Sequence, residues 1–160
     1  MLDAIVAVYA DWGIGAHGTQ PVVIKADRRR FRELTEGGAV IVGRKTLADF
    51  PGGKPLKNRA NIVLTRQGIS FEGAETAGSV GQALELAAPH SRVAVIGGES
   101  VYMAMLPHIG RVYVTKIDVT PHSDVFFPDL DADPVWRIAQ VGEEAEENGI
   151  RYRFLTYERR

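Results

Sequence analysis

Two adjacent glycines after an apolar run give this sequence its clearest sign of chemistry. The run at 93–96 is typical of a strand buried on both faces, and Gly97 and Gly98 follow it directly. Glu99 then opens a segment whose apolar periodicity predicts a helix ending before Pro107. A helix start attracts anions through its N–H groups and its dipole, and glycine lets a ligand approach the backbone closely. The pattern indicates an anion-binding site, but it also fits an ordinary strand-to-helix turn.

Two other predicted strands end in residues of a similar kind. The strand at 39–42 leads into a glycine, two cations and a hydroxyl at 43–46, which open a short helix. The strand at 60–64 is followed at once by a hydroxyl and a guanidinium at 65–66. The carboxyl ends of parallel strands meet at one edge of a sheet, where ligands bind in open α/β folds. We therefore expect the three strand ends to share one site, although the cations also fit ordinary surface charges.

A carboxylate, Asp27, occupies the first turn of a helix predicted over 25–36. In one interpretation it is a solvated acid that interacts favourably with the helix dipole. In the other, its i, i+4 spacing from Phe31 places it beside a residue that faces the core, where it is partly desolvated and poised for function. The sequence physics favours neither interpretation.

The glycines at 13–18 form a G-x-G-x-x-G pattern after the strand predicted at 4–9, as in dinucleotide-binding folds. That fingerprint needs a helix opening at the third glycine. Here Pro21 and the β-branched residues at 22–24 follow, and they resist helix formation. We expect a glycine-rich loop that acts as a lid.

Composition and charge predict one soluble globular domain over residues 1–160. The sequence is 45% apolar and 24% charged with a net charge of −1, so no overall field favours nucleic acid or an anionic membrane. It has no cysteine, which excludes disulfides and thiolate chemistry. The N-terminus lacks the basic segment of a signal peptide, and no apolar run approaches the roughly 20 residues of a membrane span. We expect a cytoplasmic monomer without nucleic-acid or membrane partners.

The sequence predicts no metal site. The four histidines, at 17, 90, 108 and 122, lack the spacing of metal ligands. The aspartates between 121 and 134 lack the spacing of a calcium loop, and we expect them to be solvated.

The remaining elements complete an α/β order. Ser79 is a suitable N-cap for a helix ending at 88, and 111–117 alternates as a strand does. Strands at 136–141 and 152–157, around 143–149, predict an antiparallel hairpin at the sheet edge.

In the order of its elements and in its residues at the strand ends, the sequence closely resembles the dihydrofolate reductase family over essentially the whole chain. The resemblance is carried by 12–15 after the first strand, Asp27 with Phe31 and Thr35, 43–46, Arg59 before 61–62, 96–98 with Tyr102, Thr115 before 117–118, and Asp124 ahead of 127–128. It implies a three-layer α/β fold. That fold has a central, mostly parallel mixed sheet of about eight strands, an antiparallel C-terminal edge hairpin and about four flanking helices.

The resemblance also implies an activity, the reduction of 7,8-dihydrofolate to 5,6,7,8-tetrahydrofolate in one-carbon metabolism. A hydride passes from C4 of NADPH to C6 of the substrate, and N5 gains a proton. Asp27 would be the catalytic residue, accepting hydrogen bonds from N3 and the 2-amino group, with the Thr115 hydroxyl behind it. Arg59 would hold the carboxylate of the glutamate tail. The residues implied to line the substrate are Ile5, Ala7, Phe31, Phe50 and Leu56, and antifolates would bind in the same place.

For the cofactor, the resemblance implies that Thr46 and the N–H groups of 98–101 bind the pyrophosphate. Arg44, Thr65 and Arg66 would surround the 2′-phosphate, which favours NADPH over NADH. The peptide bond between Gly97 and Gly98 would be cis. The full set implied to bind the cofactor is Ala7, Ile14, Gly15, Gly43, Arg44, Lys45, Thr46, Leu64, Thr65, Arg66, Ile96, Gly97, Gly98, Glu99, Ser100, Val101 and Tyr102.

Several positions depart from the family pattern. Val22 stands where tryptophan is common, Lys25 where proline is common, and Arg28 where an apolar residue usually packs. We expect Arg28 to point to solvent or to meet the glutamate tail. Two alternatives stay open: a pyrimidine reductase of riboflavin synthesis, which should lack the set of Asp27, Phe31 and Arg59, and a non-catalytic nucleotide-binding module.

Overall fold

The two ends of the chain form one unit of the structure, and the middle forms another. The computed structural model describes residues 2–160. Unit 1 consists of Asp3–Phe31 and Ile109–Arg160, and unit 2 of Leu2 and Arg32–His108. Unit 1 is therefore discontinuous in sequence. The single domain expected over 1–160 stays a prediction.

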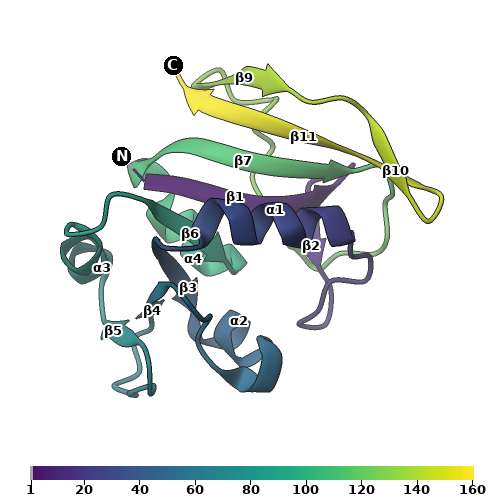
Figure 1. Cartoon of the computed structure of the whole chain (residues 1–160). Coiled ribbons are helices and arrows are strands. Elements are labelled where there is room, and N and C mark those ends of the chain that lie inside the picture. The colour runs from purple at the N-terminus through teal and green to yellow at the C-terminus, as the bar shows by residue number, and fades with distance from the viewer. Residues whose placement is uncertain (1) are drawn as a thin grey trace. The chain divides into compact units, whose positions relative to one another are not determined.

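Unit 1 is built on strands that follow one another out to an antiparallel edge. In the order in which they pair, they are β10 (Ala145–Glu147), β11 (Ile150–Arg159), β7 (Ile109–Ile117) and β1 (Leu2–Tyr9), and β9 (Trp136–Val141) also pairs with β11. β11 runs antiparallel to β7, β9 and β10. Figure 1 shows β1 and β7 running in the same direction. The strands predicted at 4–9 and 111–117 are confirmed, each extended by two residues at its N-terminal end.

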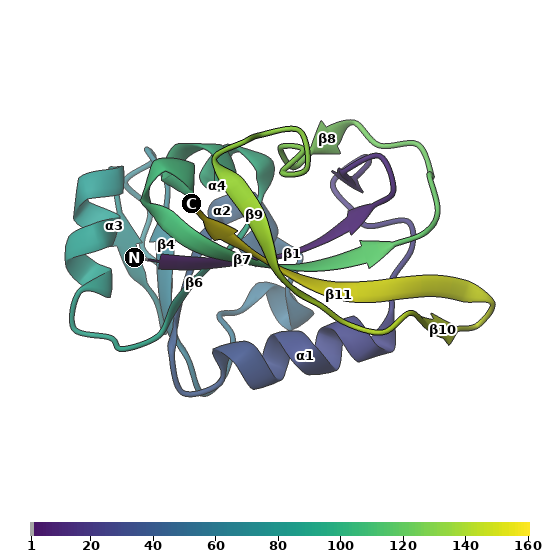
Figure 2. The ribbon, with the colours of Figure 1, turned by 90° about the horizontal axis from the view of Figure 1, so that it is seen from above.

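The C-terminal hairpin is confirmed, but its connection is not the plain loop expected at 143–149. That segment contains β10, which pairs with the start of β11. The chain reverses at Asn148 and Gly149, whose φ angles are 52° and 81°. Asn-Gly is the dipeptide that tolerates such angles in a tight hairpin turn. The result is a short two-stranded hairpin where β11 begins, visible beside the β10 label in Figure 2.

The predicted lid loop forms a small sheet of its own. β2 (Gly13–Gly15) pairs with β8 (Val125–Phe126), two short strands that the sequence did not indicate. The next helix, α1 (Lys25–Thr35), begins well beyond Gly18. The rejection of a dinucleotide-binding fingerprint at 13–18 is therefore confirmed.

Unit 2 contains four parallel strands in the order β6, β3, β4 and β5. β3 (Ala39–Gly43), β4 (Ala60–Leu64) and β6 (Val93–Gly97) confirm the predicted apolar strands. All five residues of β3 are buried, as expected for a strand covered on both faces. β5 (Glu75–Ala77) was not predicted, because three residues with one apolar side chain give no recognisable pattern.

Short helices connect the strands of unit 2. They are α2 (Arg44–Ala48), the 3₁₀ turn η1 (Pro51–Gly53), α3 (Val80–Ala87), α4 (Glu99–Met105) and the 3₁₀ turn η2 (Leu106–His108). The helices predicted from Arg44, Ser79 and Glu99 are thus confirmed. No helix within residues 2–160 combines the length and the apolar character needed to cross a membrane.

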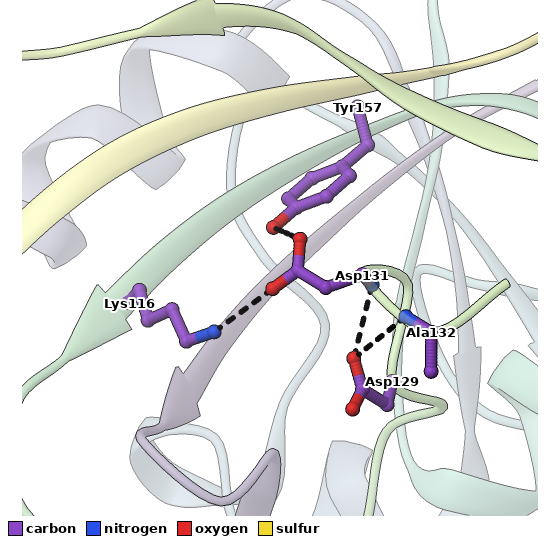
Figure 3. A network of polar contacts seen from close by, with 5 residues as sticks. All are labelled: Lys116, Asp129, Asp131, Ala132 and Tyr157. Carbon is purple, nitrogen blue, oxygen red and sulfur yellow. Dashed lines mark hydrogen bonds and ion pairs between the residues drawn. The ribbon is translucent and has the colours of Figure 1, made fainter. Parts of the chain in front are cut away.

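The acidic loop before β9 is held by hydrogen bonds, which corrects the expectation that its aspartates are merely solvated (Figure 3). Asp131 accepts from the Tyr157 hydroxyl at 2.7 Å and from the Lys116 ammonium at 3.3 Å. Asp129 accepts from the backbone N–H groups of Asp131 and Ala132 at 2.9 and 3.2 Å. These carboxylates attach the loop to β7 and β11 and satisfy its own backbone.

The Ser79 cap gives a direct test of local structure. The Ser79 hydroxyl accepts from the N–H of Gln82 at 3.1 Å. Replacing it in Ser79→Ala should lower the free energy of unfolding by about 1 kcal/mol, because that N–H loses its acceptor. Urea unfolding measures the change, with Ser79→Thr as the control that keeps the hydroxyl. Equal stabilities of wild type and Ser79→Ala would show that the cap contributes nothing.

Candidate active site

The helix α1 presents one half-buried face and one exposed face. Asp27, Arg30, Phe31 and Leu34 are all half-buried, at spacings of three and four residues, whereas Arg28 is exposed. This pattern decides between the two interpretations of Asp27, since the carboxylate lies on the covered face. The expectation that Arg28 points to solvent is also met.

The start of α1 is fixed by a carboxylate from a distant part of unit 1. The two side-chain oxygens of Glu147, on β10, accept from the N–H groups of Lys25 and Ala26 at 2.7 and 3.2 Å. A negative charge at this position also complements the helix dipole. A proline in place of Lys25 has no N–H to donate. Lys25, which departs from the family pattern, therefore supplies an N–H group that donates to Glu147.

Asp27 is hydrogen-bonded to β7. The Thr115 hydroxyl donates to its Oδ1 at 2.6 Å, and Thr115 is only 3% exposed. This is the contact that the resemblance implied. Burial raises the pKa of Asp27, while the Thr115 hydrogen bond and the charges of Arg30 and Arg28 lower it in part. The carboxylate is thus oriented by Thr115 and partly desolvated.

Two further predicted substrate residues lie on β1. Ile5 is buried and Ala7 half-buried, and they share a face of the strand because they are two residues apart. Ala7 and Val22 both pack against an apolar cluster that includes Tyr9. The Tyr9 hydroxyl donates to the carbonyl of Val22 at 2.9 Å and accepts from its N–H at 3.0 Å. Val22 therefore fills an apolar position, and its side chain brings no hydrogen-bond donor there.

Asp124 holds the lid at Gly15 and His17. The N–H of Asp124 donates to the Gly15 carbonyl at 2.9 Å, and its carboxylate accepts from the N–H of His17 at 2.9 Å. A Cβ added to Gly15 would lie 2.8 Å from the carbonyl oxygen of Thr19, so no side chain fits there. These bonds and the lack of space fix the lid backbone at Gly15, a residue that the resemblance assigns to the cofactor.

The three predicted strand ends of unit 2 meet at one edge, as expected. Gly43 on β3 pairs with Leu64 on β4, and Val42 pairs with Gly97 on β6. The segments that follow these strands therefore leave the sheet side by side. They carry the predicted cofactor residues Arg44, Lys45, Thr46, Thr65, Arg66, Glu99, Ser100 and Val101.

The glycines at this edge leave room beside Thr46. The bond between Gly97 and Gly98 is cis, as the resemblance implied. A Cβ on Gly98 would lie 3.1 Å from the Thr46 hydroxyl, and one on Gly43 would lie 3.0 Å from a methyl of Val101. Gly98 is also the N-cap of α4 and offers no side chain to its N–H groups. Backbone donors, a hydroxyl and nearby cations are the set that a pyrophosphate needs, so the residues fit a dinucleotide cofactor.

Arg59 is oriented by hydrogen bonds within unit 2. Its Nη1 donates to the buried Thr35 hydroxyl at 3.1 Å, and its Nε donates to the Lys57 carbonyl at 2.8 Å. Burial lowers the pKa of Arg59, and the charge of Glu36 opposes that effect. Two hydrogen bonds therefore fix the orientation of this guanidinium.

The other predicted substrate residues of unit 2 are Phe50 and Leu56, both half-buried. The side chain of Asn61 fixes the loop around Leu56. Its oxygen accepts from the Leu56 N–H at 3.0 Å, and its amide donates to the Leu56 carbonyl at 2.9 Å. Among residues 2–160 no group of three or more side chains is arranged to hold a metal ion.

Two residues of this region were missed by sequence reasoning. Arg30 lies three residues after Asp27, so the helical spacing that linked Asp27 to Phe31 also indicates Arg30. Glu147 lies 122 residues from Lys25, and no local pattern connects them.

Comparisons with known proteins agree on one family. The family model described as dihydrofolate reductase matches residues 1–159. The dihydrofolate reductase of Staphylococcus haemolyticus is 35% identical and covers 99% of this chain and 95% of that protein. The dihydrofolate reductase of Mycobacterium leprae is 39% identical and covers 91% of this chain and 90% of that protein.

A solved structure agrees as well. Dihydrofolate reductase from Enterococcus faecalis, complexed with NADP(H) and RAB-propyl, matches with a TM-score of 0.89 and 32% identity, covering 99% of this chain and 96% of that one. This match confirms the predicted α/β class, a mixed sheet with an antiparallel edge and flanking helices.

The buried carboxylate should cost stability. Because the pKa of Asp27 is raised in the folded protein, folding is opposed by its ionisation above that pKa, and the opposition fades as pH falls. Asp27→Asn removes the charge and keeps an oxygen that Thr115 can donate to. We expect the variant to be more stable by about 1 kcal/mol near about pH 7, with the difference narrowing as the pH falls toward the ordinary pKa of a carboxyl, about 4. Urea unfolding at both pH values checks this. A variant less stable than wild type at the higher pH contradicts it.

Proposed function

Because the chain belongs to the dihydrofolate reductase family, we propose that it reduces 7,8-dihydrofolate to 5,6,7,8-tetrahydrofolate with NADPH. The observation that carries the proposal is the half-buried Asp27 carboxylate, hydrogen-bonded to Thr115 in a chain that matches this family from end to end. Membership of this family argues against the first alternative, a pyrimidine reductase of riboflavin synthesis. A non-catalytic nucleotide-binding module is tested by the experiment below.

Asp27 is the residue proposed to hold the substrate ring. One oxygen is occupied by the Thr115 hydroxyl, which fixes the plane of the carboxylate. The carboxylate then accepts from N3 and the 2-amino group of the pterin, and its negative charge favours a proton on that ring. This is electrostatic stabilisation of charge that develops during the reaction, in a site with little water. Ile5, Ala7 and Phe31 supply the apolar surface that excludes the water.

The outer part of the substrate is assigned to unit 2. Arg59, already oriented by Thr35 and by the Lys57 carbonyl, binds the carboxylate of the glutamate tail. Phe50 and Leu56 contact the apolar middle of the substrate. Antifolates of similar shape would use the same residues.

The cofactor is assigned to the strand ends of unit 2. NADPH, when bound, supplies the hydride. Thr46 and the N–H groups at the start of α4 bind the pyrophosphate, while the glycines at 97–98 allow close approach. Arg44, Thr65 and Arg66 surround the 2′-phosphate, and Tyr102 lies beside the glycines to support the nicotinamide. The backbone of Ala7, Ile14 and Gly15 orients the carboxamide.

The cytoplasmic location and the monomeric state stay predictions. Light scattering of the purified chain tests the second. The place of the activity in one-carbon metabolism follows from the proposed product, tetrahydrofolate.

One assay tests the proposed function. Purified chain, NADPH and dihydrofolate are mixed, and the absorbance of the reduced nicotinamide is followed. We expect its steady loss and the appearance of tetrahydrofolate. Binding of NADPH without turnover supports the non-catalytic module, and the proposal is then wrong.

The role of Asp27 is tested by Asp27→Asn. We expect turnover near neutral pH to fall by at least about 100-fold, because the neutral amide does not favour a charged substrate ring. The dissociation constant of NADPH should change less than about twofold, since that site lies on other residues. A variant that keeps most of its activity rules out this assignment.

Cofactor preference is tested at the 2′-phosphate. Arg66→Leu should raise the KM for NADPH by about 10-fold or more and leave that for NADH nearly unchanged, because only NADPH carries the phosphate that the guanidinium would bind. Arg160→Leu, which removes an exposed cation at the end of the chain, is the control. Similar KM values for NADPH in the two variants contradict the assignment of Arg66.

A further inference from the structure

A second charged side chain lies on the half-buried face of α1. The guanidinium carbon of Arg30 lies 4.4 Å from the centre of the Phe154 ring and 5.6 Å from that of the Tyr113 ring. Its Nη1 is buried and finds no hydrogen-bond partner among residues 2–160. A buried donor without a partner is unfavourable, so the position of this charge needs an explanation beyond packing.

The strands beneath Arg30 also carry the partner of Asp27. Tyr113 and Thr115 are two residues apart on β7, so their side chains project from the same face. Phe154 on β11 lies directly opposite Thr115 in the antiparallel register. Arg30 therefore rests on the two rings that neighbour Thr115, and Thr115 donates to Asp27. The cation and the carboxylate are held over adjacent positions of one surface.

We propose that Arg30 is a positioning residue for the reaction assigned above: its guanidinium, fixed on the rings of Tyr113 and Phe154, supplies the positive charge that keeps the Asp27 carboxylate ionised and sets the pH range of substrate binding and reduction. The part that concerns reduction rests on the proposed function. The part that concerns the ionisation of Asp27 stands without it.

The charges around Asp27 support this role. Arg30 is the strongest of the cations that lower the pKa of Asp27 against the effect of burial, and Arg28 follows it. Burial lowers the pKa of Arg30, while Tyr113 on β7 and then Asp27 favour its charged form. The guanidinium of an arginine stays protonated even when burial lowers its pKa. From β7, Thr115 donates to the carboxylate.

The other elements at this site add one more charge. From β10, Glu147 accepts from the N–H groups of Lys25 and Ala26 and so places a negative charge at the start of the helix. β11 contributes the ring of Phe154, which is uncharged. Arg30 is therefore the principal cation that opposes the effect of burial on this carboxylate.

The charge of Arg30 lowers the proton affinity of the groups around it. Reduction requires the substrate ring to gain a proton beside Asp27. A cation next to this site opposes proton uptake by the carboxylate and by the bound ring alike. Removing the cation should let both take up a proton at higher pH.

The first measurement uses the full chain without ligands. The ¹³C chemical shift of the Asp27 carboxyl carbon is followed against pH in wild type, Arg30→Met, Arg30→Lys and Arg29→Met. We expect the midpoint to rise by about half a pH unit or more in Arg30→Met, and to stay within about 0.2 of wild type in Arg30→Lys, which keeps the charge. Arg29→Met is the matched control, because it removes an exposed charge from the same turn of α1.

The second measurement is the pH profile of kcat for dihydrofolate reduction, which reports the groups that titrate in the enzyme–substrate complex. The alkaline limb should move to higher pH in Arg30→Met by a similar amount, while the KM for NADPH stays within about twofold. A side chain needed only for packing would lower activity at every pH and leave the limb in place.

Each outcome has a definite meaning. Equal midpoints in Arg30→Met and Arg29→Met overturn the proposal, and so does a shifted midpoint with an unshifted limb. If Arg30→Met fails to fold, Arg30→Gln takes its place, because it removes the charge and keeps a polar end. If the wild type does not reduce dihydrofolate, the proposed function fails, but the titration of the ligand-free chain still decides whether Arg30 controls Asp27.

Discussion

Taking a negative charge out of water, and keeping it charged, is the constraint on which this structure depends. Asp27 lies on the covered face of α1, where burial alone favours its neutral form. A short hydrogen bond from the buried Thr115 hydroxyl and two nearby arginines counter that tendency. The strands β7 and β11 provide the rigid surface that holds the donor and one of the cations. A carboxylate in such a setting interacts strongly with any cationic partner, because little solvent is present to screen the two charges.

The position of that charge depends on contacts far away in sequence. Glu147 binds the first N–H groups of α1 and so fixes where the helix begins. Glu147 is itself positioned by the turn at Asn148 and Gly149, which returns the chain from β10 to β11. Because Asp27 lies within the first turn, its distance to Thr115 follows from where the helix starts. The hairpin of β10 and β11 thereby supports a residue of the candidate site through the start of α1.

The sequence predicted well what local pattern encodes. Continuous apolar runs identified β3, β4 and β6, and the register then brought their ends together as expected. Strands of two or three residues such as β5 and β8 were missed, because they form by pairing and carry no periodicity of their own. The glycine motif at 13–18 was interpreted correctly only because the residues after it were considered.

In the candidate site, too, local pattern predicted some features, while others depend on tertiary contacts. Helical spacing placed Asp27 beside Phe31 but did not show whether that face was covered, which depends on tertiary packing. The bond from Glu147 to Lys25 joins residues 122 positions apart, and local sequence does not encode it. The same helical spacing also indicates Arg30, which lies three residues after Asp27. It was overlooked because a cation is rarely assigned to a half-buried face.

The discontinuity of unit 1 has a consequence for biosynthesis. Residues 3–31 leave the ribosome before 109–160 have been made, so β1 and α1 emerge without β7, β10 and β11. Unit 2 is almost continuous and is complete as soon as His108 has emerged. Until translation reaches the C-terminal hairpin, β1 therefore lacks its partner β7, and α1 lacks the Glu147 carboxylate that binds its first N–H groups. That interval is when the growing polypeptide has the greatest need of a chaperone.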